Sequence, residues 1–177
     1  LSSIQDYIDT WRELGQKFDT IYSGFLGSIE QINLVENLIK TNTQALVVVD
    51  PVLGDHGSLF PIFDDSYVME MKKLVSMADL ITPNITEANL LLGLNPNQFG
   101  YNDSDLKNIC RDLSKLGPGL VIITGFLIDG YIYNISYDAH TDTMVKFGKP
   151  YNKMSFSGTG DIFTSIVAAL ITRDFDI

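Results

Sequence analysis

The chain has 177 residues and a formal net charge of −10, and 45% of its residues are hydrophobic. This length suits one sizeable core, and the hydrophobic and aromatic content excludes a disordered chain. The negative charge, with no basic stripe in the sequence, argues against nucleic acid as a partner because a phosphate backbone would be repelled.

The order of periodic segments predicts alternating strands and helices. The expected elements, in chain order, are a helix at 4–14, a short strand with a glycine-punctuated loop at 18–28, a helix at 29–41, a strand at 44–50, a loop at 51–61, a helix at 66–77, a short strand at 78–84, a helix at 85–93, a loop at 95–102, a helix at 103–117, a strand at 119–125, two alternating segments at 130–138 and 142–150, and a helix at 160–172. Such alternation is typical of an α/β fold with a mostly parallel sheet, and the two alternating segments predict an added antiparallel hairpin.

The single cysteine, Cys110, has no partner for an intramolecular disulfide, which is compatible with a reducing cytosol. Its helical neighbours favour a buried structural thiol. The longest apolar-leaning run, at 162–171, is about half of a membrane span, and the first nine residues lack a signal-peptide pattern. We therefore expect a cytoplasmic protein.

Polar residues gather after the predicted strands. In open α/β sheets, ligands bind outside the carboxyl ends of the strands. The residues expected at that edge are Asp50 and Asp55 after one strand, Thr82, Asn84 and Glu87 after the next, Thr124 and Gly125 after a third, and Gly158, Thr159, Gly160 and Asp161 before the last helix. Their convergence on one edge is more informative than any single motif.

The stretch "SFSGTGDIF" contains the most specific of these motifs. Glycines allow close approach of a ligand, and the free N–H groups at a helix start favour an anion. Asp161 would then accept a proton from a substrate hydroxyl during phosphoryl transfer. The motif alone equally allows a second interpretation, in which Asp161 only caps the helix and the glycines form a turn.

The carboxylates on the neighbouring loops also have two interpretations. Asp50 ends a buried strand, where a charge is costly unless it is paired, hydrated or metal-bound, and with Asp55 it could hold Mg²⁺. The alternative is an Asx turn leaving the sheet. Glu87 follows Asn84 by three residues, so "NITE" fits a capping box as well as a ligand site.

Several common site types are excluded or unsupported by the sequence. His56 and His140 have no partner at metal-ligand spacing and are interpreted as ordinary surface histidines. No P-loop motif, no glycine-rich dinucleotide-binding motif after a strand and no nucleophile elbow occurs.

Taken together, "SGFLGSIEQ", "DPVLGDHGSLF", "TPNITEA" and "SGTGDIF" resemble the ribokinase-like superfamily, and most of all its pyridoxal (vitamin B6) kinases. The resemblance spans residues 19–172. It implies a ribokinase-like three-layer sandwich of the α/β class, with a mostly parallel central sheet flanked by helices, an antiparallel hairpin near 130–149, and one domain over 1–177.

The resemblance also implies an activity. Members transfer the γ-phosphoryl group of ATP to the 5′-hydroxymethyl group of pyridoxal, pyridoxine or pyridoxamine, which is the vitamin B6 salvage reaction that gives pyridoxal 5′-phosphate. The near alternative is a hydroxymethylpyrimidine kinase of the thiamine pathway. A third hypothesis, from a different class, is an inactive remnant that binds a nucleotide or vitamer without turnover.

Residue roles carried over from the family follow the matched motifs. Asp161 is expected as the general base, with Gly158, Thr159 and Gly160 as the anion hole. Asp50 and Glu87 are expected to position Mg²⁺, directly or through water, and Asp55 to serve a monovalent cation such as K⁺ or a phosphate. The residues expected to face ATP are Thr82, Asn84, Thr124 and Gly125, and those expected beside the substrate are Phe25, near the pyridine ring, and Ser157.

Two departures from the family pattern concern the ends of the chain. Family members begin with a further strand and a flap over the site, and they continue past the "GTGD" helix with elements that wrap the adenine. We therefore expect a chain that is incomplete at both ends and that lacks part of both binding pockets. The resemblance also implies a homodimer.

Overall fold

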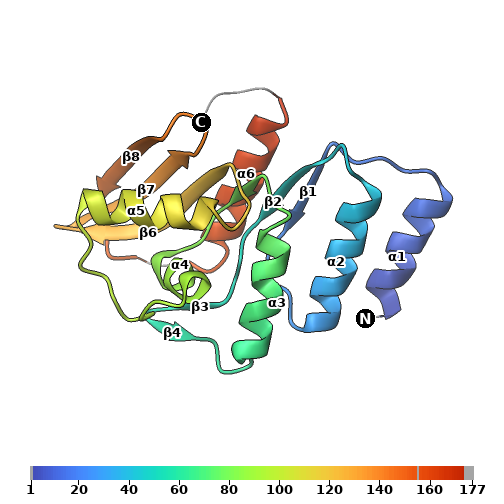
Figure 1. The fold of residues 1–177 in the computed structure, drawn as a ribbon, viewed down its shortest axis with the longest axis horizontal. Helices are drawn as coiled ribbons and strands as arrows, with labels where there is room; N and C mark the ends of the chain where they lie inside the picture. Colours follow the sequence, from blue (N-terminus) through green and yellow to red (C-terminus); the bar gives the residue numbers. More distant parts are fainter. Residues whose placement is uncertain (1, 155, 174–177) are drawn as a thin grey trace.

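The computed structural model describes residues 2–154 and 156–173 (Figure 1). The helices are α1 (Ser2–Glu13), α2 (Ile29–Thr41), α3 (Asp65–Val75), α4 (Ile85–Leu92), α5 (Asp103–Ser114) and α6 (Thr159–Ile171). The strands are β1 (Thr20–Ser23), β2 (Leu46–Val49), β3 (Gly54–Asp55), β4 (Ser58–Leu59), β5 (Leu80–Ile81), β6 (Leu120–Ile128), β7 (Tyr131–Asp138) and β8 (Thr143–Pro150).

Within the described ranges, the main sheet has six strands in the order β1-β2-β5-β6-β7-β8. Strands β1, β2, β5 and β6 run parallel, whereas β7 pairs antiparallel with β6 and β8 antiparallel with β7. The predicted mostly parallel sheet and the hairpin near 130–149 are therefore confirmed. The small β3–β4 hairpin lies in 51–61, which the sequence predicted as a loop.

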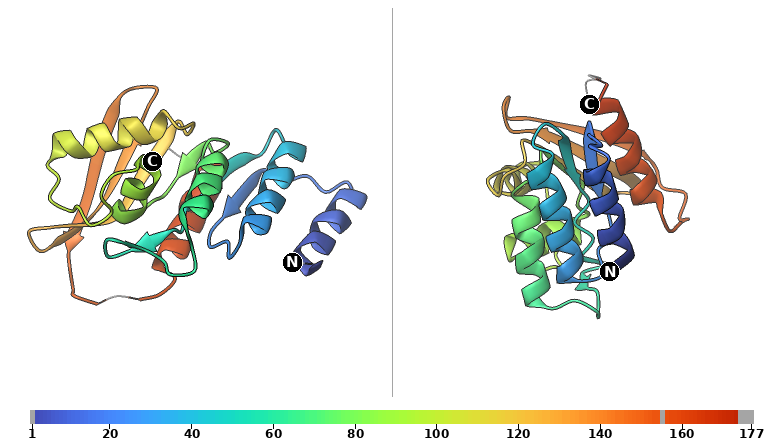
Figure 2. Two further views of the ribbon diagram at one scale, coloured as in Figure 1. Left: turned by 60° about the horizontal axis from the view of Figure 1, so that its bottom comes forward. Right: turned by 90° about the vertical axis from the view of Figure 1, so that its right-hand side faces the viewer.

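The helices form layers on the two faces of the sheet. Helices α2 to α5 cover one face and α6 packs on the opposite face, as Figures 1 and 2 show. Helix α1 lies beyond α2 at the β1 end of the molecule (Figure 1). The predicted three-layer arrangement is confirmed, and the carboxyl ends of the parallel strands point toward the start of α6.

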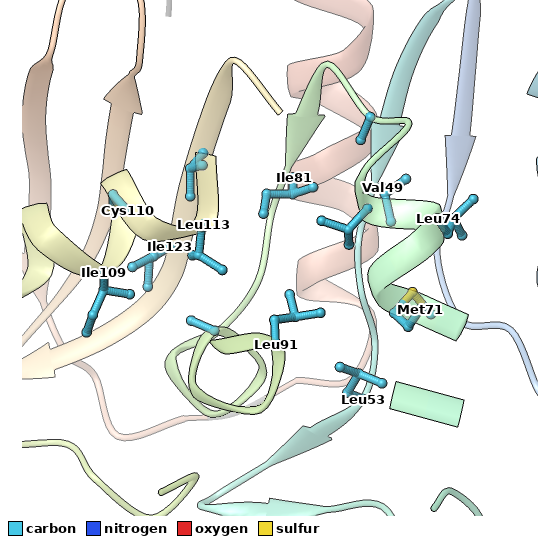
Figure 3. Close-up of a cluster of buried hydrophobic side chains, with 14 of the residues drawn as sticks. Val49, Leu53, Met71, Leu74, Ile81, Leu91, Ile109, Cys110, Leu113 and Ile123 are labelled. Atoms are coloured by element: carbon cyan, nitrogen blue, oxygen red, sulfur yellow. The ribbon is translucent and has the colours of Figure 1, made fainter. Parts of the chain in front are cut away.

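The main core lies between the sheet and helices α2 to α5 (Figure 3). Its fully buried members include Met71, Leu74 and Ile123, and Cys110 is fully buried as predicted. Burial of such side chains contributes about 1.5–3 kcal/mol each relative to exposure. This layer therefore supplies most of the apolar burial that fixes the strand ends in place.

A smaller core lies on the other face, between the sheet and α6. Val48 and Ile122 pack there against Val167 and Ala168 of α6. The central strands are thus covered on both sides, which explains why "LVVV" of β2 is apolar without alternation. Contacts on this face hold α6, and with it the glycine-rich loop, against the sheet.

Among the helices of the described ranges, none has the length and apolar character needed to cross a lipid bilayer.

Candidate active site

A pocket of about 340 Å³ lies where the loops after β1 and β2 meet the starts of α4 and α6; we call it the carboxylate pocket. It is lined by Phe25, Asp50, Val52, Gly54, Asp55, Phe60, Asn84, Glu87, Thr124, Ser157, Gly158, Gly160 and Asp161. Most residues that the sequence singled out thus lie around one cavity, although their contacts differ from case to case.

The glycine-rich loop opens α6 without a side-chain cap. Gly158 is the N-cap residue, with φ of 84°, a left-handed conformation that favours glycine. The N–H groups of residues 159–161 have no intrahelical acceptor at this position, and the helix dipole adds partial positive charge. The first turn of α6 therefore presents N–H groups and partial positive charge, a combination that favours an anion.

Asp161 lies in that first turn and does not cap the helix. It is exposed to solvent, and its Oδ1 atom lies 3.4 Å from the hydroxyl of Tyr22 on β1. Its Oδ2 atom lies on the side of Gly158, 3.9 Å from the position of a Cβ added there. The interpretation of Asp161 as a simple cap is therefore not supported, and its Oδ2 atom remains available to a ligand.

Asp50 follows β2 directly and is buried, with 8% exposure. Its backbone N–H donates to the carbonyl of Ser23 at 2.9 Å, so the strand ends remain paired up to this residue. Burial, followed by the nearby charge of Asp161, raises the pKa of Asp50 to about 7. Burial disfavours the ionised form of this carboxylate, and a cation bound beside it would stabilise that form.

Glu87 both caps α4 and lines the carboxylate pocket, the two interpretations that the sequence left open. It forms a capping box with Asn84, whose N–H donates to Glu87 Oε2 at 2.8 Å. Its Oε1 accepts from the N–H of Leu53 at 3.2 Å. The side chain is buried, and burial followed by the charge of Asp50 raises its pKa well above the usual range. The predicted capping box is confirmed, and the same carboxylate faces the carboxylate pocket.

The charge of the pocket lining fits a divalent cation. Four carboxylates line it, and no Lys or Arg occurs among its lining residues. In the described ranges, however, no group of three His, Cys, Asp or Glu side chains is arranged as a metal site. These features suit Mg²⁺, which keeps several waters and binds through one or two carboxylates and substrate phosphates. Because Glu87 already accepts two N–H groups, Asp50 is the better direct ligand.

Aromatic side chains form the wall of the pocket away from α6. Phe25, on the loop after β1, is 56% exposed, and its ring centroid lies 5.9 Å from that of Phe63. Phe63 stacks in turn on Tyr67 at 3.8 Å, and the Tyr67 hydroxyl donates to the carbonyl of Leu26. Phe60 completes the lining. The rings of Phe25 and Phe60 thus give the pocket an aromatic surface against which a planar ring could pack.

A second pocket of about 260 Å³ adjoins the first; we call it the side pocket. Asp55, Asn84 and Thr124 line both pockets, and Gly125 lines the side pocket alone. The register of β6 against β7 shifts between Ile123 and Phe126, which marks a β-bulge at Thr124 and Gly125. Gly125 has φ of 67°. The bulge turns this part of β6 toward the start of α4, where Thr124 forms an isolated bridge with Asn84.

Two predicted site residues are placed differently. Thr82 is buried, and its hydroxyl lies 2.9 Å from that of Thr164 on α6. The expectation that Thr82 faces a nucleotide is corrected, because its side chain joins β5 to α6 inside the protein. The Thr159 hydroxyl donates to the carbonyl of Phe156 at 3.1 Å, so only its backbone is free to meet an anion.

The structure adds residues that the sequence reasoning missed. Phe60 and Val52 line the carboxylate pocket, and Tyr22 contacts Asp161. Phe60 is the last residue of the "DPVLGDHGSLF" motif, five positions after Asp55, so its place in that motif was a usable signal. His56, interpreted as an ordinary surface residue, is highly exposed but lines the side pocket.

Comparison with known proteins identifies the family. A family model described as phosphomethylpyrimidine kinase matches residues 4–177. The chain belongs to this family. The curated proteins that this chain matches include pyridoxal kinases of Arabidopsis thaliana and Homo sapiens, each 28% identical, so the resemblance predicted from the four motifs is confirmed.

Solved structures of family members have the same fold. A pyridoxal kinase from Lactobacillus plantarum is 30% identical with a TM-score of 0.86, over 97% of this chain and 60% of that one. A Bacteroides thetaiotaomicron protein, provisionally assigned as a phosphomethylpyrimidine kinase and solved with pyridoxal, is 38% identical with a TM-score of 0.90, over 97% and 62%. The predicted ribokinase-like fold is confirmed.

A curated relative carries the alternative activity. The hydroxymethylpyrimidine/phosphomethylpyrimidine kinase of Aquifex aeolicus is 27% identical over 87% of this chain and 59% of its own length. The chain spans about half the length of the first curated relatives that it matches.

Proposed function

We propose that the whole protein is an ATP-dependent kinase that phosphorylates the 5′-hydroxymethyl group of pyridoxal, pyridoxine or pyridoxamine. The observation that carries this proposal is the position of Asp161. Its carboxylate lies beside the uncapped start of α6 and lines the same pocket as an aromatic wall. The groups that we propose as base, anion site and ring surface thus line one cavity.

The acceptor alcohol would lie between Phe25 and Asp161. The aromatic wall would hold the pyridine ring, with Ser157 beside it, and direct the hydroxymethyl group toward Asp161. The pyridoxal-bound Bacteroides relative supports a ring of this kind. Holding the alcohol within about 3–3.5 Å of its reaction partner is itself a large part of the rate enhancement.

Asp161 would act as the general base. Its Oδ2 atom would accept the hydroxyl proton as the alcohol oxygen bonds to the γ-phosphorus and the bond to the leaving ADP oxygen breaks. The N–H groups of the Gly158–Asp161 turn would stabilise the charge on the transferring group. The side pocket, through Asn84, Thr124 and Gly125, would hold the remainder of the nucleotide.

Asp50, with Glu87 through water, would hold Mg²⁺. When bound, the ion neutralises the phosphate charge that four carboxylates would otherwise repel. Asp55 lines both pockets and would serve a monovalent cation such as K⁺ or a phosphate.

A hydroxymethylpyrimidine kinase is the second candidate. The family description and the Aquifex relative favour it. The chemistry at Asp161 would be unchanged, and only the ring against Phe25 and Phe60 would differ. An inactive binding protein is the third hypothesis, and the Asp161 carboxylate on the pocket argues against it.

The experiment is a substrate panel on the whole protein. ATP and Mg²⁺ are supplied with pyridoxal, pyridoxamine or hydroxymethylpyrimidine, and phosphorylated product is measured. We expect the highest kcat/KM with a B6 vitamer. Turnover of hydroxymethylpyrimidine alone would select the second candidate, and binding without turnover of any acceptor would select the third.

We further propose a single domain and a homodimer, which the resemblance implies, and a cytoplasmic location, which the sequence predicts. Limited proteolysis, sedimentation equilibrium and cell fractionation of the whole protein test them in that order.

A further inference from the structure

Tyr22 is a polar residue next to the proposed base that the function described above does not use. It is the third residue of β1, a strand whose even-numbered residues are half-buried and whose odd-numbered ones are buried. Ile21 belongs to the core under α2 to α5, and Tyr22 packs with the cluster under α6. Its ring therefore lies on the α6 face and its hydroxyl reaches the start of that helix.

The Tyr22 hydroxyl has a carboxylate as its acceptor. It lies 3.4 Å from Asp161 Oδ1, across 139 positions of sequence. Thr164, one turn further along α6, is a second neighbour of this hydroxyl and lies 2.9 Å from Thr82. A polar row thus runs from the end of β5 through α6 to the proposed base.

Gly24 leaves the space that this pair needs. A Cβ added at Gly24 would lie 3.2 Å from the Tyr22 hydroxyl oxygen and 3.3 Å from Asp161 Oδ1. Any side chain there would press on both groups. The loop after β1 therefore closes over the hydroxyl and carboxylate without separating them.

Tyr22 acts as a donor throughout the working pH range. Burial, and then the charges of Asp50 and Asp161, raise the pKa of Tyr22 far above its usual value of 10.0. The phenol therefore keeps its proton and Asp161 accepts.

We propose that Tyr22 is a positioning residue for Asp161. Its hydroxyl donates to Oδ1 and fixes the carboxylate so that Oδ2, on the Gly158 side, receives the proton of the acceptor alcohol. This inference rests on the proposed kinase function. A purely structural Tyr22 would only fill space under α6, and its ring would suffice for that.

The test compares Tyr22→Phe with wild type in the whole protein, using pyridoxal and ATP. The matched control is Tyr137→Phe, because the Tyr137 hydroxyl also donates to an aspartate, Asp142, at 2.9 Å but outside both pockets. We expect kcat to fall about ten- to hundredfold in Tyr22→Phe, with the KM for pyridoxal within about twofold, as for the loss of a hydrogen bond to a charged group. The control keeps wild-type kinetics.

A double mutant separates positioning from other effects. If Tyr22 acts through Asp161, adding Tyr22→Phe to Asp161→Asn gives no further loss of kcat. A wild-type kcat in Tyr22→Phe, or a full further loss in the Asp161→Asn background, overturns the proposal. Failure of the kinase function itself is recognised separately. In that case the wild type does not phosphorylate pyridoxal, or Asp161→Asn keeps the wild-type kcat, and both results are obtained with Tyr22 unchanged.

A readout without turnover is the crystal structure of Tyr22→Phe. We expect the Asp161 carboxylate to rotate away from its wild-type position, and an unchanged carboxylate contradicts positioning. Should Tyr22→Phe fail to fold, Gly24→Ala is the second variant, since its methyl group would displace the same pair. An unchanged kcat and an unchanged Asp161 position in Gly24→Ala would also overturn the proposal.

Discussion

Glu87 on α4 accepts a hydrogen bond from the backbone N–H of Leu53 at 3.2 Å. Leu53 lies three residues after Asp50, so the loop after β2 is joined to the start of α4 through this carboxylate. Both Glu87 oxygens accept N–H groups; the Glu87 side chain and its bond to Leu53 are buried, and its bond to Asn84 is partly buried. The residue that caps α4 therefore also fixes the loop on which Asp50 and Asp55 lie.

This arrangement predicts that Glu87→Gln is costly to stability. One oxygen would become an NH₂ group facing an N–H donor, so a buried hydrogen bond is lost and its donor left unsatisfied. We expect the free energy of unfolding to fall by about 1–3 kcal/mol, measured by urea denaturation.

Asp105→Asn is the control for that measurement. Asp105 occupies the same position in the exposed capping box of α5, with Asn102 as the N-cap. We expect a change within about 0.5 kcal/mol there. Equal losses at the two sites would mean that burial of Glu87 adds nothing to its capping role.

The raised pKa of Asp50 predicts that the stability of the folded protein depends on pH in metal-free buffer. Its pKa is about 7 in the folded protein against 3.8 for an ordinary aspartate, so the folded state binds more protons between these values. Ionisation of Asp50 therefore lowers the stability of the wild type as the pH rises from about 4 to 7, by up to about 4 kcal/mol, and this contribution levels off above pH 7. Glu87, whose pKa is also raised, adds a loss of the same sign.

Asp50→Asn removes this titration. The variant should match wild type near pH 4 and exceed it at pH 8 in metal-free buffer, as measured by urea denaturation at each pH. Excess Mg²⁺ should stabilise wild type at pH 8 and leave Asp50→Asn unaffected. Parallel pH curves for the two proteins would refute the assignment.

The buried position of Thr82 predicts that its substitution lowers stability without weakening nucleotide binding. Thr82→Val leaves the Thr164 hydroxyl without its 2.9 Å partner, and we expect a loss of about 1–3 kcal/mol in unfolding free energy. The KM for ATP should remain within about twofold, because the Thr82 side chain is buried under α6. Thr82→Ser, which keeps the hydroxyl, should restore stability. A tenfold rise in KM for ATP in a stable Thr82→Val protein would restore the nucleotide-facing role.

Cys110 predicts an unreactive thiol in the native protein. It is fully buried, and burial raises its pKa to about 12. A thiol reagent such as DTNB should titrate no group in the native protein and one after unfolding in guanidinium chloride. Rapid native labelling would show that α5 opens far more readily than its packing suggests.

The predicted fold follows closely from local sequence signals. Helix α4 illustrates why: Asn84 and Glu87 form the capping box, and Gly93 ends the helix in a left-handed conformation, with φ of 69°. Each signal lies within the segment that it specifies. The β3–β4 hairpin was missed because two-residue strands are too short to show a period.

The site was predictable where it depended on strand ends and motifs, and less so where it depended on side-chain direction. That Asp50, Glu87 and Asp161 line one pocket follows from the parallel topology. The contacts of Tyr22 and Thr82 depend on where α6 returns to the sheet, 139 and 82 positions away in sequence. Short-range patterns carry no information on such separations, so these two residues were missed or misplaced.

The central claim is that Asp161 is the base of a phosphoryl transfer to an alcohol. The most direct measurement is kcat for ATP-dependent phosphorylation of pyridoxal by the whole protein and by Asp161→Asn, with thermal unfolding recorded for both. We expect kcat to fall about 10²–10⁴-fold in a folded variant. Wild-type turnover by Asp161→Asn would contradict it.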